Sequence, residues 1–304
     1  MNKNEIAQIL LKELPEYMVK IDEPMKNHTS FKIGGPADVY VSPSTVDQLK
    51  FTIDTCKDKN IPYYILGNGS NLLVKDGGYR GVIIHIFRNM NDISVKGNEV
   101  YAQAGALLVK VANTCLDNNL TGFEFAHGIP GTIGGAVFMN AGAYGGEMKQ
   151  VILSADVIDK NGKLITLTNS ELELGYRTSK IQKENMIVVG ATISLEQGDH
   201  NEIKDMMDDL AHRRRTKQPL TLPSAGSTFK RPEGAYAGKL IMDSNLRGYK
   251  VGDACVSEKH CGFIVNKGQA TSKDVIELIS HIQQTVKDKF QRELQLELRI
   301  IGED

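Results

Sequence analysis

The sequence lacks several features that would each point to a familiar class of protein. Its charges almost cancel, with 36 Lys and Arg against 37 Asp and Glu over 304 residues, so overall charge gives no reason to expect nucleic acid or an anionic membrane as a partner. No apolar run approaches the roughly 18 residues that would span a bilayer. The first residues lack a basic stretch followed by an apolar core, so we expect no signal peptide.

Cysteine is scarce and spaced poorly for a metal or redox site. The four cysteines form no C-x-x-C pair. Cys255, His260 and Cys261 could supply half of a metal site, but no second half is visible. We therefore predict buried free thiols, no bound metal and a reducing, cytoplasmic location.

The familiar nucleotide-binding loops are missing as well. No G-x-G-x-x-G follows a strand, which excludes the Rossmann fingerprint. Residues 234–239 come closest to a Walker A loop, but they are one residue short, and Leu240 stands where Ser or Thr would bind magnesium.

The chain does contain two unusual glycine-rich loops, at residues 67–71 and 128–135, and the second is followed by another glycine-rich stretch at 140–147. Main-chain N–H groups in such loops can turn inward and meet an anion without a Cβ in the way. Two such loops suggest a long ligand whose diphosphate is held at two places.

Hydrophobic periodicity predicts a small β-α-β-β unit, a second unit from about residue 90 to 200, and a third that begins after the Pro219 and Pro223 breaks. Arg213–Arg215 end a predicted helix, and they could form a phosphate patch or merely complement the helix C-terminus. Strands are expected at residues 37–41, 63–66, 72–74, 82–86, 100–104, 154–159, 163–168, 186–195 and 294–301, and helices near the N-terminus and around 46–56, 107–115, 202–215 and 275–290.

Several motifs, in order along residues ~20–302, resemble known families. Residues 31–38, 66–71 and 128–135 are similar to the FAD-binding domain shared with vanillyl-alcohol oxidase and p-cresol methylhydroxylase. More specific motifs resemble the UDP-N-acetylenolpyruvoylglucosamine reductases, namely Tyr176–Ser179, Pro223–Pro232, Ala237–Ile241 and Glu297–Arg299. Residues 178–216 contain no Tyr, so the chain resembles the shorter subclass of this family, which lacks an inserted tyrosine-bearing loop.

The resemblance implies an α+β fold with an FAD-binding domain in two subdomains and a smaller α+β substrate domain. The implied boundaries are 1–88 and 89–213 for the two subdomains, the second joined by the C-terminal strand 293–304, and 214–292 for the substrate domain. It further implies a monomeric, cytoplasmic oxidoreductase that binds neither nucleic acid nor membrane. With noncovalent FAD and NADPH, this flavoprotein would reduce the enolpyruvyl ether of a UDP-sugar to UDP-N-acetylmuramate, for peptidoglycan synthesis in cell wall biogenesis, cell shape and cell division.

The resemblance also implies three catalytic residues. Hydride addition to the enolpyruvyl group builds negative charge beside its carboxylate, and such charge needs fixed cations or strong donors. Arg177 would hold the carboxylate with its planar fork. Glu297 would assist as a protonated carboxyl or through a short hydrogen bond, and Ser227 would supply the final proton.

The remaining implied contacts concern cofactor and substrate. Lys217, Lys230 and Tyr176 are the expected substrate contacts. The expected FAD contacts are Gly67, Asn68, Gly69, Ser70, Asn71, Gly128, Ile129, Pro130, Gly131, Thr132, Gly134, Gly135, Asn140, Ala141 and Gly142.

Plainer interpretations and other functions stay open at this point. A serine after glycine is usually a turn or cap residue, and Glu297 between two leucines would ordinarily be the outward residue of a strand. A flavin oxidase of the same superfamily is the first alternative, raised by His127 before the second loop, because such oxidases often tether FAD through His or Cys. A nucleotide-sugar binding protein is the second, although binding alone needs no proton donor.

Overall fold

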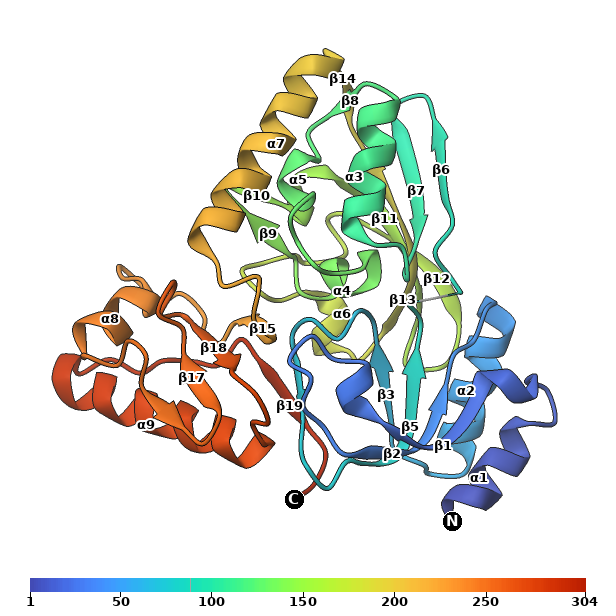
Figure 1. Ribbon diagram of the computed structural model, residues 1–304. Coiled ribbons are helices and arrows are strands. Elements are labelled where there is room, and N and C mark those ends of the chain that lie inside the picture. The colour runs from blue at the N-terminus through green and yellow to red at the C-terminus, as the bar shows by residue number, and fades with distance from the viewer. Residues whose placement is uncertain (88) are drawn as a thin grey trace. The chain divides into compact units, whose positions relative to one another are not determined.

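The computed structural model describes residues 1–87 and 89–304, and the chain divides into two compact units (Figure 1). Unit 1 consists of Met1–Ile21, Val39–Asn68 and Val82–Arg214. Unit 2 consists of Asp22–Asp38, Gly69–Gly81 and Arg215–Asp304. The predicted functional boundaries at 88, 213 and 292 stay predictions, because compactness does not test which segments bind FAD or substrate.

One sheet has the strand order β1-β2-β5-β3, and its last two strands run parallel. The helix that follows β2 begins at Thr45, whose hydroxyl accepts the N–H of Gln48, and it buries Leu49, Ile53 and Cys56 at helical spacing. The elements are α1 (Lys3–Leu10), η1 (Glu16–Met18), β1 (Val19–Pro24), η2 (Met25–Asn27), β2 (Pro36–Val41), α2 (Val46–Asp58), β3 (Tyr63–Leu66) and β5 (Tyr79–His85).

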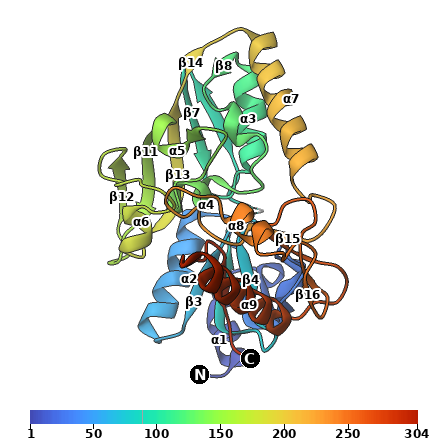
Figure 2. The same ribbon diagram turned by 90° about the vertical axis from the view of Figure 1, so that its left-hand side faces the viewer.

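The second sheet of unit 1 is antiparallel, in the order β12-β11-β13-β7-β6. Helix α3 lies beside this sheet and α7 lies beyond α3 in both views (Figures 1 and 2). The elements of this region are β6 (Ile93–Lys96), β7 (Glu99–Gln103), α3 (Leu108–Asp117), β8 (Leu120–Thr121), η3 (Glu124–Ala126), α4 (Ile133–Phe138), β9 (Gly142–Ala143), β10 (Gly146–Glu147), α5 (Met148–Val151), β11 (Ile152–Ile158), β12 (Leu164–Thr168), α6 (Lys180–Lys183), β13 (Ile187–Ser194), β14 (Glu196–Gln197) and α7 (His200–Lys217).

Unit 2 is built on a sheet of order β15-β18-β17-β16, against which α9 packs, and on a parallel pair of β19 with β4. Asp76 follows β4 and accepts the Ser272 N–H at 2.9 Å, which ties that segment to the start of α9. The elements are β4 (Leu72–Val74), β15 (Ser224–Ser227), α8 (Ala237–Asp243), β16 (Lys250–Val251), β17 (Ala254–Val256), β18 (Phe263–Asn266), α9 (Ser272–Phe290) and β19 (Arg299–Ile301).

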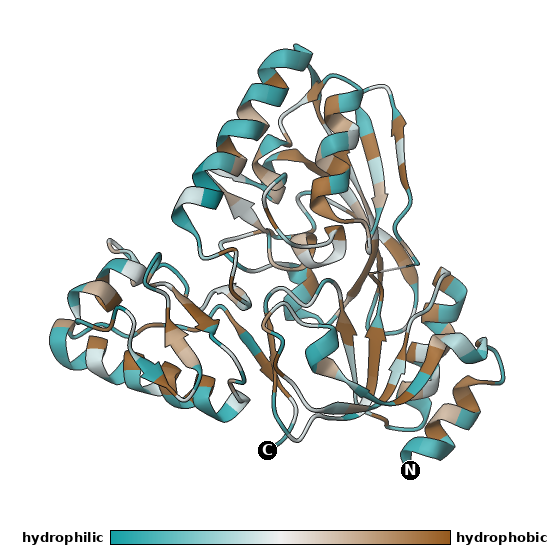
Figure 3. Ribbon diagram, viewed as in Figure 1, coloured by the Kyte–Doolittle hydropathy of each residue, from teal (hydrophilic) through white to brown (hydrophobic). Residues whose placement is uncertain are grey.

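Each unit has its own hydrophobic core. Hydrophobic residues line β3 and β5, whereas α7 is mostly hydrophilic (Figure 3). Phe123 and Leu108 are among the fully buried side chains of unit 1, and Phe31 and Leu73 are among those of unit 2. Non-directional burial of this kind is the main stabilising contribution to both units.

Most elements predicted from periodicity are confirmed, but the predicted strand 294–301 is wrong in length. Only Arg299–Ile301 forms a strand, while Leu296 makes an isolated bridge to Phe229. The four cysteines are buried and free, as predicted. Among the described residues, no helix is long and apolar enough to cross a membrane.

Candidate functional site

The second glycine loop, residues 128–135, is anchored on the connection between β7 and α3. Ile133 donates its N–H to the Ala106 carbonyl at 2.9 Å, and Gly134 donates to the Ala104 carbonyl at 2.8 Å. A Cβ on Gly134 would lie 3.0 Å from the Ala104 Cβ. Glycine at this position therefore lets the loop lie against the chain that follows β7.

Part of the first glycine loop touches the second within unit 1. The Asn68 amide donates to the Pro130 carbonyl at 2.9 Å. A Cβ on Gly67 would lie 2.7 Å from the Thr132 hydroxyl, which accepts the Gly135 N–H. Across the part of the chain that the structure describes, the main-chain N–H groups of residues 67–70 have no protein acceptor. These unused donors suit an anion.

A half-buried cation lies beside the second loop. A Cβ on Gly128 would lie 3.1 Å from the Cδ of Arg214, near the end of α7. Burial lowers the pKa of the Arg214 guanidinium from its usual value, although arginine stays charged at neutral pH. No carboxylate among the described residues pairs with Arg214, whereas Arg213 pairs with Asp209 at 2.6 Å. Of the terminal arginines, Arg214 is thus placed to meet an anion.

His127, at the start of the same loop, is half-buried, and its Nδ1 atom is buried with no hydrogen-bond partner among the described residues. Burial lowers the pKa of this imidazole, against an opposing effect of Asp208. His127 is therefore neutral at pH 7.

Arg177 lies in a tight turn of unit 1. Gly175 and Thr178 exchange main-chain hydrogen bonds of 3.0 and 3.2 Å across the turn. Arg177 itself has φ +55°, a left-handed conformation that is uncommon for a residue with a side chain. Its guanidinium reaches the Gly142 carbonyl at 3.5 Å and lies 5.3 Å from the ring of Tyr176, which is itself exposed. The fold thus holds this side chain against the stretch that follows the second glycine loop.

Ser227 and Glu297 lie on adjacent segments of unit 2. Glu297 donates its N–H to the carbonyl of Thr228, the residue after Ser227, at 2.9 Å. The Asn71 amide donates to the Glu297 carbonyl at 3.1 Å. The side chains of Ser227 and Glu297 are both half-buried. The structure therefore places Ser227 and Glu297, which lie 70 residues apart in sequence (297 minus 227), on adjacent segments.

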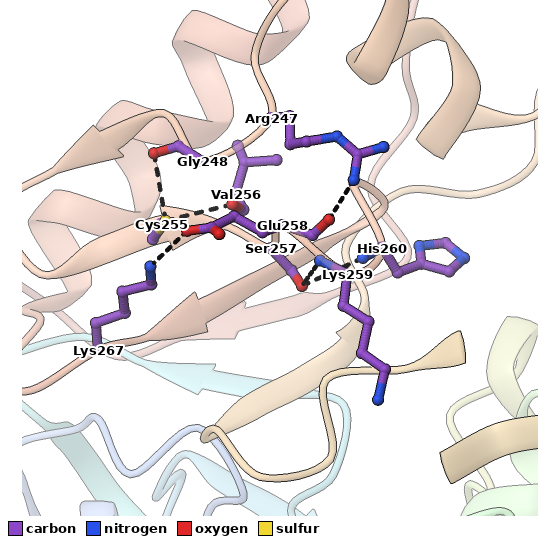
Figure 4. A network of polar contacts seen from close by, with 9 residues as sticks. All are labelled: Arg247, Gly248, Cys255, Val256, Ser257, Glu258, Lys259, His260 and Lys267. Carbon is purple, nitrogen blue, oxygen red and sulfur yellow. Dashed lines mark hydrogen bonds and ion pairs between the residues drawn. The ribbon is translucent and has the colours of Figure 1, made fainter. Parts of the chain in front are cut away.

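A network of polar contacts in unit 2 includes residues 255–260 (Figure 4), and the chain just beyond it pairs with the segment that carries Ser227. Ser227 is the register partner of Phe263, and Thr228 donates its N–H to the Gly262 carbonyl at 2.9 Å. The loop before Gly262 is braced by Ser257, whose hydroxyl accepts the N–H of His260 at 3.3 Å. Further contacts of the network are Lys267 to Glu258, Arg247 to the Glu258 carbonyl, and the Cys255 thiol to the carbonyls of Gly248 and Val256.

Lys230 lines a polar cavity of about 290 Å³ in unit 2. Its main-chain N–H donates to the Gln295 carbonyl at 2.8 Å, which joins the two segments that form the cavity. Lys217, the last residue of α7, is exposed. The other residues that line the cavity are Arg231, Pro232, Glu233, Arg292, Glu293 and Gln295.

Comparisons with known proteins indicate one family over nearly the whole length of the chain. The FAD binding domain family matches residues 37–168, and the C-terminal domain family of UDP-N-acetylenolpyruvoylglucosamine reductase matches residues 218–301. A UDP-N-acetylenolpyruvoylglucosamine reductase of Clostridium perfringens (strain SM101 / Type A) is 56% identical over 300 residues, which cover 99% of this chain and 98% of the relative. The enzyme of that name from Alkaliphilus oremlandii is 54% identical over 304 residues, covering 100% of both. This chain belongs to the UDP-N-acetylenolpyruvoylglucosamine reductase family.

A solved structure gives the same result for the fold. The crystal structure of UDP-N-acetylenolpyruvylglucosamine reductase from Thermus caldophilus is 34% identical, with a TM-score of 0.79, and the match covers 93% of this chain and 97% of that one. The predicted α+β fold with an FAD-binding domain is confirmed, as is the prediction of an FAD-dependent oxidoreductase.

Sequence reasoning did not single out Arg214 among the residues that border the loops. The signal was present in α7, where Ile203, Met207 and Leu210 are buried and Arg214 continues their spacing of four, three and four. A charge that falls on the buried face of a helix needs a partner, and no such partner occurs among the described residues. This pattern separates Arg214 from its two neighbours.

Proposed function

We propose that this chain uses NADPH to reduce the enolpyruvyl ether of UDP-N-acetylglucosamine-enolpyruvate to UDP-N-acetylmuramate in peptidoglycan precursor synthesis. The main support for the proposal is the hydrogen bond from the Glu297 N–H to the Thr228 carbonyl, because it holds the segments that carry Ser227 and Glu297 next to each other. A reduction that ends in protonation needs a positioned donor of this kind.

The two glycine loops suit an FAD diphosphate. Within unit 1, the N–H groups of residues 67 and 68 and the guanidinium of Arg214 have no protein partner among the described residues, and they are donors that suit such an anion. FAD held by these residues would supply the hydride transfer from NADPH to the substrate carbon. The predicted FAD contacts in the loops and at residues 140–142 stay predictions, in the case of Asn140 through its main chain only, and Arg214 is added to them.

The proposed roles of the catalytic residues follow from their chemistry. Arg177 holds the substrate carboxylate through paired hydrogen bonds and stabilises the charge that builds beside it. Glu297 donates a hydrogen bond to the same charge, and Ser227 gives the proton that completes the lactyl ether. Main-chain hydrogen bonds hold the segments that carry these side chains.

Three further residues are proposed to contact the nucleotide part of the substrate. Lys230 has a cavity beside it that holds further basic side chains, which suits a diphosphate. Lys217 and Tyr176 are exposed, and their contacts with the substrate remain proposals. The cytoplasmic location and the monomeric state also remain proposals.

The alternative of a flavin oxidase is not favoured, because the family match covers nearly the whole chain. Noncovalent FAD is part of the proposal, and mild acid denaturation should therefore release the flavin. A flavin that stays attached to His127 would contradict it.

An anaerobic two-step experiment tests the proposed function. NADPH should bleach the flavin absorbance, and the enolpyruvyl nucleotide should restore it with formation of the lactyl ether. UDP-N-acetylglucosamine, which has no double bond, is the matched control and should leave the flavin bleached. Recovery with oxygen but not with the enolpyruvyl nucleotide would favour the oxidase instead.

A further inference from the structure

Asn140 occupies an unusual place between the second glycine loop and the turn that carries Arg177. It follows α4, it is 1% exposed, and it adopts the left-handed conformation with φ +46°. Asparagine tolerates this conformation better than most residues. The backbone alone therefore explains an Asn or Gly here, but it does not explain what the side chain contacts.

The side-chain amide of Asn140 is committed to three protein atoms. Its Nδ2 donates to the Gly175 carbonyl and to the Glu147 carboxylate, both at 3.1 Å. Its Oδ1 accepts the Lys149 N–H at 2.9 Å. Both donors of the amide are used, so this side chain has no donor left for a ligand.

These contacts close a ring of interactions around Arg177. Gly175 is the first residue of the Arg177 turn. The Arg177 guanidinium reaches the Gly142 carbonyl, and Gly142 is the register partner of Glu147 in the β9–β10 pair. The ring therefore runs from Asn140 through the turn to Arg177, across to Gly142 and Glu147, and back to Asn140.

We propose that Asn140 is a positioning residue, which aims Arg177 by holding the carbonyl at the base of its turn. The inference rests on the proposed role of Arg177 in holding the substrate carboxylate. Asn140 acts through Arg177 and does not touch the substrate. The left-handed conformation of Arg177 makes such support necessary, because unfavourable backbone geometry persists only when its surroundings hold it.

The substitution Asn140→Gly removes all three side-chain bonds while the backbone remains free to adopt a positive φ. We expect reduction by NADPH to keep within about twofold of the parent rate. We expect flavin reoxidation by the enolpyruvyl nucleotide to fall about 10²-fold, the cost of a 1 Å misplacement of a catalytic group. Hydrogen exchange in a peptide that spans residues 175–178 should become faster, and this readout needs no substrate.

Two further variants make the test specific. Asn60 also has a positive φ, +51°, in unit 1, and it lies at the end of α2 outside the proposed site, so Asn60→Gly should change neither half-reaction. Asn140→Asp keeps an acceptor for the Lys149 N–H and tolerates the same conformation, but it cannot donate to the Gly175 carbonyl. It should reproduce the selective loss even if Asn140→Gly fails to fold.

A double variant separates failure of this proposal from failure of the proposed function. If Asn140 acts through Arg177, then adding Asn140→Gly to Arg177→Lys should cost less than threefold more in reoxidation. Equal losses in both half-reactions, or fully additive losses, would overturn the positioning role. If Arg177→Lys alone reoxidises at the parent rate, the role proposed for Arg177 is wrong, and the role of Asn140 is wrong with it.

Discussion

At the scale of single residues, the role proposed for Arg177 depends on geometry more than on charge. Its planar fork and its left-handed turn together set the direction from which a carboxylate can be met. The substitution Arg177→Lys keeps the charge but loses the paired contact, so we expect flavin reoxidation to slow by at least ~10²-fold, consistent with loss of a bidentate, charge-stabilising contact. Rapid-mixing absorbance measures each half-reaction separately. A defect confined to reduction by NADPH would remove Arg177 from the proposed role.

Ser227 allows a second prediction at this scale. The substitution Ser227→Ala should preserve folding, FAD binding and reduction by NADPH, because none of these needs the hydroxyl. Reoxidation by the enolpyruvyl nucleotide should fall ~10²–10⁴-fold, as is typical when a general acid is lost. Ser227→Cys should retain part of the activity, because a thiol can release a proton from nearly the same position. Reoxidation of Ser227→Ala at the parent rate would instead point to water or Glu297 as the proton source.

At the scale of elements, two glycines have nearly the same left-handed backbone conformation, but only one of them lies in close contact with another segment. Comparing alanine substitutions at the two positions therefore separates the cost of backbone strain from the cost of a steric clash. Gly69 has φ +62°, and a Cβ there would lie 2.0 Å from the His28 carbonyl oxygen. Gly97, between β6 and β7, has φ +60° with nothing within 4 Å. Gly97→Ala should therefore cost only the ~1–2 kcal/mol of a left-handed residue with a Cβ.

We predict that Gly69→Ala displaces the first glycine loop and weakens FAD binding at least tenfold, since the backbone must move to accommodate the methyl group. Titration of flavin-free protein with FAD measures this loss, and Gly97→Ala should bind FAD as the parent does. Equal FAD affinity in the two variants would show that the close approach to His28 is not needed for the cofactor site.

Sequence periodicity predicted elements better than it predicted contacts between them. The helix that became α2 could be predicted from its apolar spacing, because that signal is local, whereas its cap at Thr45 came from the structure. The strand expected at 294–301 was too long, because alternation at Glu297 satisfied the pattern while only a single bridge pairs Leu296 with Phe229. Asn140 gained its interpretation only from tertiary contacts, which no local pattern contains. The helical spacing of α7 did place Arg214 on the buried face, but its closeness to the second glycine loop came from the structure.

At the scale of the whole molecule, each unit contains a histidine that responds to acid in the same direction. His127 belongs to unit 1 and His260 to unit 2, and burial lowers the pKa of both from the usual value of 6.5. The Nδ1 atom of His260 accepts the Gly262 N–H at 3.1 Å, which favours the neutral ring with its proton on Nε2. Both imidazoles are therefore neutral in the folded protein at pH 7.

Acid should consequently destabilise both units in a defined window. Below pH 6.5 the unfolded chain binds protons at these histidines before the folded chain does, so the free energy of unfolding falls as the pH falls from 6.5 through the folded pKa values. The exposed carboxylates of Glu258 and Glu293, whose pKa values the lysines beside them lower from 4.5, lose their contributions only at more acidic pH. The histidine window is therefore separate from the carboxylate window.

The substitution His260→Asn tests this window, because the amide oxygen of Asn can accept the Gly262 N–H but the side chain does not titrate. Urea unfolding at pH 7.5, 6.5, 5.5 and 5.0 should give the parent a free energy of unfolding that declines below pH 6.5. The variant should decline less steeply over the same range, while the two proteins should run parallel above pH 7. Parallel curves at every pH would mean that His260 titrates alike in the folded and unfolded chains and that its burial has no effect on stability.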